Sequence, residues 1–166
     1  VEIDISDPDS EGLGEIIVKN KNCMNGYFSN NGKEQKISSR NWFHTGDAGY
    51  FKEDGHLVVI DRITDLSFTS EKLRYSPQYL ENKLKFSPFI AEAAVIGSNK
   101  PYLSAIICIR FSVLSKWAEQ KRIAFTTYSD LASKQEIEKI LIDEVSKVNL
   151  SVPKKQKIKK FVLLYK

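Results

Sequence analysis

Two short apolar runs joined by an Asp-Gly turn restrict the fold of this chain more than any other feature. The runs are residues 47–51 and 56–60, and residues 52–55 connect them. An Asp-Gly pair between two apolar runs is a strong local signal for a β-hairpin, because glycine accepts the positive φ that tight turns need. We therefore expect a hairpin here. A short strand is expected before it, within GLGEIIVK at residues 12–19.

The pattern changes after Asp61, where strands and helices begin to alternate. A small ribbon (66–69 with 73–75), strands 90–96, 103–111 and 158–164, and helices over 112–121 and from residue 133 to Pro153 are expected. Ser76 and Pro77 have the chemistry of an N-cap and a first helical residue, so another helix should begin there. The chain should therefore be α+β, a β-hairpin subdomain followed by a small two-layer α+β domain.

Composition excludes several classes of protein. The 166 residues are 42% hydrophobic and 28% charged, which is typical of a globular protein with a core rather than of a disordered tail. No apolar run approaches the roughly 18 residues that span a bilayer. Two Asn-Gly pairs, at residues 25–26 and 31–32, predict further turns. The net charge of +4 is too small to indicate nucleic acid, although the run KKQKIKK (154–160) is strongly basic.

No self-contained catalytic device occurs in the sequence. There is no phosphate loop of the GxxxxGK[ST] type, no GxGxxG, no GxSxG and no HExxH. His44 and His56 are the only histidines, and neither has a helical partner four residues away, so a metal site is not expected.

One stretch, residues 41–65, does carry chemistry. Asp47 follows Gly46 in a tight turn just before a strand, and a carboxylate held there can accept two hydrogen bonds from a cis-diol such as ribose. Arg62 offers a fixed set of donors for hydroxyls or phosphate. In the structural alternative Asp47 only caps its turn, and Arg62 pairs with Asp61 or Asp65.

The ordered string WFHTGDAGYFKEDGHLVVIDRxxD resembles the adenylate-forming superfamily, which includes acyl-CoA synthetases, peptide-synthetase adenylation domains and luciferases. GEIIVKNKNCMNGYF and SPQYLENKLKFSPFIAEAAVIG are similar to stretches on either side of that motif. WAEQKRIAFTTYSDL and IKKFVLLYK are most similar to the long-chain fatty acid–CoA ligase branch. The resemblance covers essentially the whole chain.

The resemblance implies an ATP-dependent ligase of fatty acid metabolism. Such enzymes join a fatty acid to AMP with the help of Mg²⁺ and then transfer the acyl group to coenzyme A. Residues 1–61 would be the β-rich end of the large N-terminal domain, and residues 62–166 the small C-terminal lid domain. The resemblance implies that this small domain rotates about a hinge between the two steps. The implied location is the cytoplasm, with peripheral membrane contact as an open alternative.

The resemblance also assigns roles to residues. Asp47 and Arg62 would bind the ribose of the nucleotide, Thr64 and Asp65 would form the hinge, and Gly49 and Tyr50 would support the Asp turn. Glu81 is expected to be structural.

The sequence departs from the family pattern at three positions. The hinge residue is Thr64 where Lys or Asp is usual, and Asn20 stands where glycine is expected. The loop at residues 70–74 has no glycine on the side that would face coenzyme A. Lys72 and Arg74 could meet a phosphate there or could simply be exposed charges.

The family's phosphate-gripping loop and its acyl pocket would lie before this segment, and its catalytic Lys after it. We therefore expect a C-terminal fragment with no catalytic residue of its own, inactive alone, whose partners are the missing N-terminal domain, a fatty acid, ATP and coenzyme A. Two alternatives stay open, a non-catalytic binding or regulatory domain of the same fold and, with less support, a nucleic-acid module.

Overall fold

The computed structural model describes residues 1–21, 26–27, 35–36 and 42–165. Of the predicted Asn-Gly turns, Asn25 and residues 31–32 lie outside the described residues. The chain divides into two compact units, Val1–Leu66 and Ser67–Lys166. Each unit is described by itself below.

The first unit is an antiparallel sheet in the order β1-β2-β5-β6. Its strands are β1 (Glu2–Ser6), β2 (Gly14–Lys19), β5 (Phe43–Phe51) and β6 (Leu57–Arg62), and a small ladder joins β3 (Gly26–Tyr27) to β4 (Gln35–Lys36). The 3₁₀ turn η1 (Ile63–Asp65) follows β6. The predicted hairpin is therefore confirmed as β5–β6, with both strands longer than the apolar runs indicated.

The core of this unit is small. Among the described residues, the buried apolar side chains that cluster are Leu13, Ala48, Tyr50 and Leu66. Gly49 allows the strands to approach closely, because a Cβ added there would lie 2.5 Å from the carbonyl oxygen of Val58.

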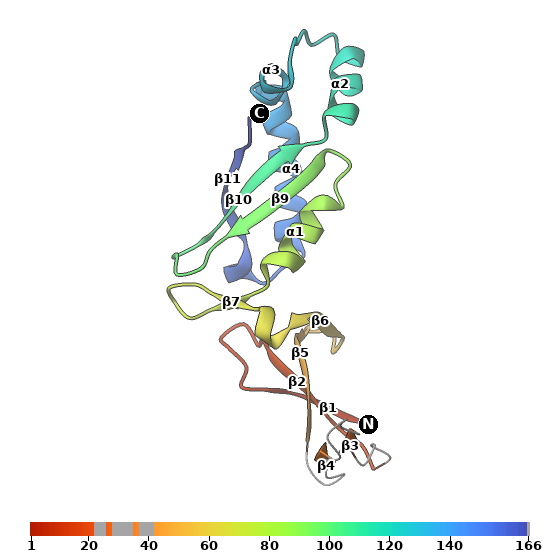
Figure 1. The fold of residues 1–166 in the computed structure, drawn as a ribbon, viewed down its shortest axis with the longest axis vertical. Coiled ribbons are helices and arrows are strands. Elements are labelled where there is room, and N and C mark those ends of the chain that lie inside the picture. Colours follow the sequence, from red (N-terminus) through yellow and green to blue (C-terminus); the bar gives the residue numbers. More distant parts are fainter. Residues whose placement is uncertain (22–25, 28–34, 37–41, 166) are drawn as a thin grey trace. The chain divides into compact units, whose positions relative to one another are not determined.

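The second unit is a two-layer α+β domain. Its sheet has the order β11-β10-β9, with β9 antiparallel and β11 parallel to the central β10. Helices α1 and α4 contact each other, and both lie on the same side of this sheet (Figure 1). The elements are β7 (Ser67–Phe68), β8 (Arg74–Tyr75), α1 (Pro77–Lys85), β9 (Ile90–Ile96), β10 (Leu103–Ile109), α2 (Phe111–Gln120), α3 (Tyr128–Ala132), α4 (Gln135–Leu150), η2 (Lys154–Gln156) and β11 (Ile158–Leu163).

Local signals explain how these elements begin. The Ser76 side chain accepts a hydrogen bond of 2.9 Å from the backbone N–H of Tyr79, and Pro77 is the first residue of α1, as predicted. Alternate residues of β10 are buried, and Leu103, Ala105, Ile107 and Ile109 face the helices. The α+β fold class is confirmed.

Four details differ from the sequence-based expectations. Strand β1 was not predicted, and α3 was missed because five residues are too few for a helical period to show. Phe86, which follows Leu80 and Leu84 in the sequence at roughly helical spacing, is the C-cap of α1 and is 87% exposed. Helix α4 ends at Leu150, before Pro153.

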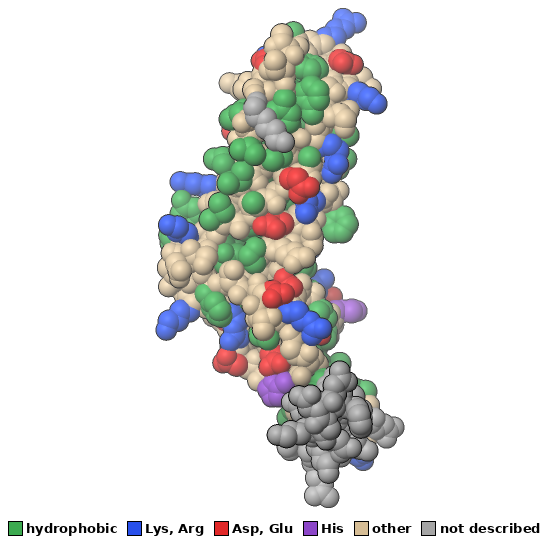
Figure 2. Space-filling model, in the orientation of Figure 1, with side chains coloured by type: hydrophobic (Ala, Val, Ile, Leu, Met, Phe, Trp, Pro, Cys, Tyr) green, Lys and Arg blue, Asp and Glu red, His purple; other side chains and the backbone are tan. Residues whose placement is uncertain are grey.

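Charges of both signs are interspersed on the face drawn in Figure 2. No helix in the described part of the chain has the length and apolarity required to cross a bilayer.

Candidate functional site

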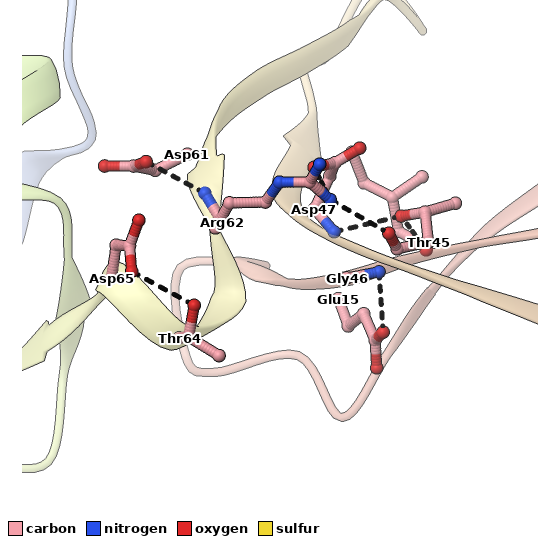
Figure 3. A network of polar contacts seen from close by, with 9 residues as sticks. Glu15, Thr45, Gly46, Asp47, Asp61, Arg62, Thr64 and Asp65 are labelled. Carbon is pink, nitrogen blue, oxygen red and sulfur yellow. Dashed lines mark hydrogen bonds and ion pairs between the residues drawn. The ribbon is translucent and has the colours of Figure 1, made fainter. Parts of the chain in front are cut away.

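Asp47 and Arg62 lie opposite each other on neighbouring strands. They are register partners in the β5–β6 pair, so their side chains leave the same face of the sheet. One guanidinium nitrogen of Arg62, Nη1, lies 3.0 Å from Oδ1 of Asp47 (Figure 3). The two side chains are 62% and 40% exposed, so both ends of the pair are accessible to a ligand.

The alternative pairings of Arg62 are not those of the structure. Asp61 accepts a hydrogen bond of 2.9 Å from the backbone N–H of Arg62, and Asp65 accepts one of 3.0 Å from the Thr64 hydroxyl. The guanidinium instead contacts Asp47 and donates to the carbonyl oxygen of Thr45 at 3.3 Å. The structure thus brings together the two residues that the sequence singled out.

The turn before Asp47 is held by polar contacts. Gly46 has a φ of +75°, the left-handed conformation that favours glycine. The Thr45 hydroxyl donates to the carbonyl oxygen of Ile16 at 2.7 Å and accepts from the backbone N–H of Asp47 at 3.1 Å. The backbone N–H of Gly46 donates to Oε1 of Glu15 at 3.0 Å.

Glu15 and His44 belong to this network, and the sequence did not point to them. Oε2 of Glu15 lies 2.8 Å from Nδ1 of His44. The one signal available was the pair Gly14-Glu15 at the start of an apolar run, where a carboxylate at the beginning of a strand is unusual.

Thr64 and Asp65 lie in the 3₁₀ turn η1 at the end of the first unit. The residues on either side, Arg62 and Leu66, have extended backbone conformations. Both Thr64 and Asp65 are exposed. Their role as a hinge stays a prediction.

The loop between β7 and β8 contains no glycine, but one of its residues has the left-handed backbone conformation that favours glycine. Lys72 has a φ of +60°. Its backbone N–H donates to the carbonyl oxygen of Thr69 at 3.0 Å, and the Thr69 hydroxyl accepts from the N–H of Leu73 at 3.2 Å. Lys72 is exposed, whereas Arg74 is half-buried and its carbonyl oxygen accepts from Nε2 of Gln156 at 3.2 Å.

The known proteins that match this chain in sequence include three CoA ligases. The long-chain-fatty-acid–CoA ligase FadD15 of Mycobacterium tuberculosis is 30% identical over 152 residues, which are 91% of this chain and 25% of that protein. A 2-succinylbenzoate–CoA ligase of Bacillus cereus is 34% identical over 142 residues, 86% of this chain and 26% of that protein. Mouse long-chain-fatty-acid–CoA ligase 6 is 31% identical over 137 residues, 81% of this chain and 20% of that protein.

This chain is homologous to the C-terminal part of adenylate-forming CoA ligases. It spans between a fifth and about a quarter of the length of the relatives named above. No family model matches it.

Two solved structures share the fold of this chain. The adenylation domain of a carboxylic acid reductase from Segniliparus rugosus, solved with AMP and a co-purified carboxylic acid, superposes with a TM-score of 0.55 at 17% identity. It is matched over 99% of this chain and 26% of its own. A coronafacic acid ligase from Pectobacterium brasiliense superposes with a TM-score of 0.54 at 16% identity. The match covers 99% of this chain and 28% of that ligase.

Glu81 and His56 make polar contacts away from the Asp47–Arg62 pair. Oε1 of Glu81 in α1 accepts from the backbone N–H of Val95 at 2.8 Å and so satisfies an amide of β9. His56 pairs with Asp54 in the hairpin turn, where its backbone N–H and ring lower the pKa of Asp54 below 3.8.

The described residues contain no group of three or more His, Cys, Asp or Glu side chains that could hold a metal ion.

Proposed function

We propose that this chain is part of an ATP-dependent, AMP-forming long-chain fatty acid–CoA ligase. In this proposal residues 1–61 form the β-rich end of the large domain and residues 62–166 form the small C-terminal domain, and Arg62 at their junction completes the ribose-binding pair with Asp47. The observation that carries it is the pairing of Asp47 with Arg62 at 3.0 Å on one face of the β5–β6 hairpin.

The chemistry of this pair suits a nucleotide sugar. The Asp47 carboxylate only accepts hydrogen bonds, so it can take one from each hydroxyl of a cis-diol, and such charge-assisted bonds are strong. Arg62 holds the carboxylate in place and keeps donors available, since a guanidinium has five N–H groups. The pair is thus prepared for ribose before the nucleotide arrives.

The two-step reaction explains why two compact units are needed. A carboxylate is a poor electrophile, so the acid is first joined to AMP with loss of pyrophosphate, and the thiol of coenzyme A then displaces AMP. In our proposal the small domain turns about Thr64 and Asp65 between these steps. Its Lys72 and Arg74 then lie on the side of coenzyme A.

The long-chain fatty acid is the preferred substrate class in this proposal. FadD15 and mouse ligase 6 are named for long-chain fatty acids and each matches more than four fifths of this chain. The Bacillus cereus relative is named for 2-succinylbenzoate, so both acids belong in the test.

Replacing Asp47 tests the proposal in the full-length ligase that carries this chain. Asp47→Ala should raise the KM for ATP roughly tenfold to a hundredfold, because hydrogen bonds to a charged group contribute about 1.5–3 kcal/mol each. Pyrophosphate release is measured with palmitate or 2-succinylbenzoate as the acid. Glu53→Ala, an exposed carboxylate in the same hairpin, is the matched control and should leave the KM unchanged.

An unchanged KM for ATP in Asp47→Ala would remove the ribose role. A kcat/KM for 2-succinylbenzoate above that for palmitate would overturn the long-chain assignment while leaving the nucleotide site intact. The 166-residue chain alone should release no pyrophosphate above the buffer blank. If the intact protein also releases none while binding AMP, the alternative of a non-catalytic binding domain is favoured.

A further inference from the structure

We propose that Glu15 is a positioning residue that holds the turn carrying the ribose-binding carboxylate. This inference rests on the proposed role of Asp47. Glu15 does not touch the nucleotide in this account. It fixes the backbone from which Asp47 reaches out.

The strand register shows why the turn needs such a support. In the β2–β5 pair, Glu15 is opposite Ala48 and Ile17 is opposite His44. Residues 45–47 therefore face Ile16 alone and have no register partners on the β2 side. A bulge of this kind leaves backbone groups outside the regular ladder and redirects side chains.

Two side chains take over the role of the missing ladder bonds. Glu15 accepts a hydrogen bond from the backbone N–H of Gly46 (Figure 3). The Thr45 hydroxyl donates one to the carbonyl oxygen of Ile16. Glu15 is itself fixed by its second oxygen, which lies 2.8 Å from Nδ1 of His44. The Glu15 side chain is only 22% exposed, so water competes weakly for these contacts.

The position of this turn should matter for binding more than for folding. Gly46 has many accessible conformations, and its φ of +75° is not imposed by its own side chain. Without Glu15 the turn can relax while the flanking strands stay paired. A displacement of about 1 Å in a positioning group can lower activity by as much as 10²-fold.

The substitution Glu15→Gln removes the charge of the side chain and keeps its ability to form hydrogen bonds. In Glu15→Gln the amide oxygen can still accept from Gly46, and the amide NH₂ can donate to Nδ1 of His44 when the ring proton is on Nε2. Glu15→Ala removes both contacts. A support that acts through hydrogen bonds should therefore survive in the glutamine variant and fail in the alanine variant.

The experiment measures pyrophosphate release by the full-length ligase with ATP and palmitate varied separately. Glu15→Ala should raise the KM for ATP about tenfold, the cost of one to two lost hydrogen bonds, and leave the KM for palmitate unchanged. Glu15→Gln should stay within about twofold of the parent on the same grounds. Glu2→Ala, an exposed carboxylate on the neighbouring strand β1, is the control.

Each outcome decides the proposal. An unchanged KM for ATP in Glu15→Ala, together with a raised one in Asp47→Ala, would overturn the positioning role and keep the ribose site. Equal effects of the alanine and glutamine variants would overturn it as well, because the charge would then be acting. No effect of Asp47→Ala would instead remove the proposed function on which the inference rests.

Should Glu15→Ala fail to fold, Thr45→Val removes the other support with little change in shape. It should raise the KM for ATP about as much and spare that for palmitate. A parallel rise in both KM values would indicate a general structural role and overturn the proposal.

Discussion

In the unit of Ser67–Lys166 a continuous apolar core lies between the sheet and the helices α1 and α4, and its centre is completely buried at Leu84, Ile107 and Leu141. In the unit of Val1–Leu66 the described apolar cluster is limited to four buried residues, and ladders and polar side chains hold the strands. The proposed ribose site lies entirely in the unit of Val1–Leu66, in which polar contacts contribute more than apolar packing.

The difference separates stability from site geometry. A large core tolerates changes on its surface, since its stability comes from buried area. A sheet held by a bulge, a glycine turn and individual hydrogen bonds depends on single residues. Substitutions in the two units should therefore have different signatures, and peptide-resolved hydrogen exchange can report each unit separately.

Removing a core side chain from α4 should have the largest effect. Leu141 is fully buried, so Leu141→Ala should destabilise its unit by about 2–5 kcal/mol through lost burial and a residual cavity. Ile142, its neighbour on the same helix, is 46% exposed, and Ile142→Ala should cost less than about 1 kcal/mol. Urea unfolding followed by exchange of the β10 amides measures both. Similar losses in the two variants would contradict the burial pattern.

Gly49→Ala should destabilise the first unit in the corresponding way. The added methyl would lie 2.5 Å from the carbonyl oxygen of Val58 and 2.8 Å from Cδ1 of Ile16, so the strands must separate at a cost of about 1–3 kcal/mol. Exchange should rise in β5 and β6 and stay constant in β10. Lys52→Ala, exposed in the same hairpin, is the control. An equal rise in both units would show that they unfold together.

Loss of the α1 cap should be intermediate. Ser76→Ala removes the acceptor for the N–H of Tyr79 and should cost about 1 kcal/mol. The matched change Ser112→Ala, at an exposed position of α2, should lie within about 0.5 kcal/mol of the parent. Urea midpoints provide the comparison, and a Ser112→Ala loss as large as that of Ser76→Ala would argue against a cap-specific effect.

Lys72→Gly should give the smallest change, and in the opposite direction. A non-glycine residue at a φ of +60° carries backbone strain, so glycine should stabilise the second unit by up to about 1 kcal/mol. Lys100→Gly, at a position without positive φ, should destabilise it by about 0.5–1 kcal/mol. If the two variants change the free energy of unfolding of the second unit in the same direction, the turn is not strained.

The sequence predicted those features that depend on neighbouring residues. The β5–β6 hairpin followed from its turn, and the start of α1 followed from Ser76 and Pro77. Strand β1 was missed because most of it is exposed, so it has no buried face to impose a pattern. Asp47 and Arg62 could be singled out because both lie in one continuous stretch that resembles the adenylate-forming superfamily. Glu15 could not, because its contact with Gly46 depends on the register of strands about thirty residues apart.

The parallel pairing of β11 with β10 has a consequence for how the second unit forms. Strands β9 and β10 are adjacent in the chain and can join as soon as both exist, whereas α2, α3 and α4 separate β10 from β11. Closing so long a connection is slow, because the chain loses conformational entropy before the β10–β11 contacts that offset this loss can form. During synthesis on the ribosome, the β10 edge of this sheet therefore stays unpaired until β11 emerges. In that interval the exposed edge is most in need of a chaperone.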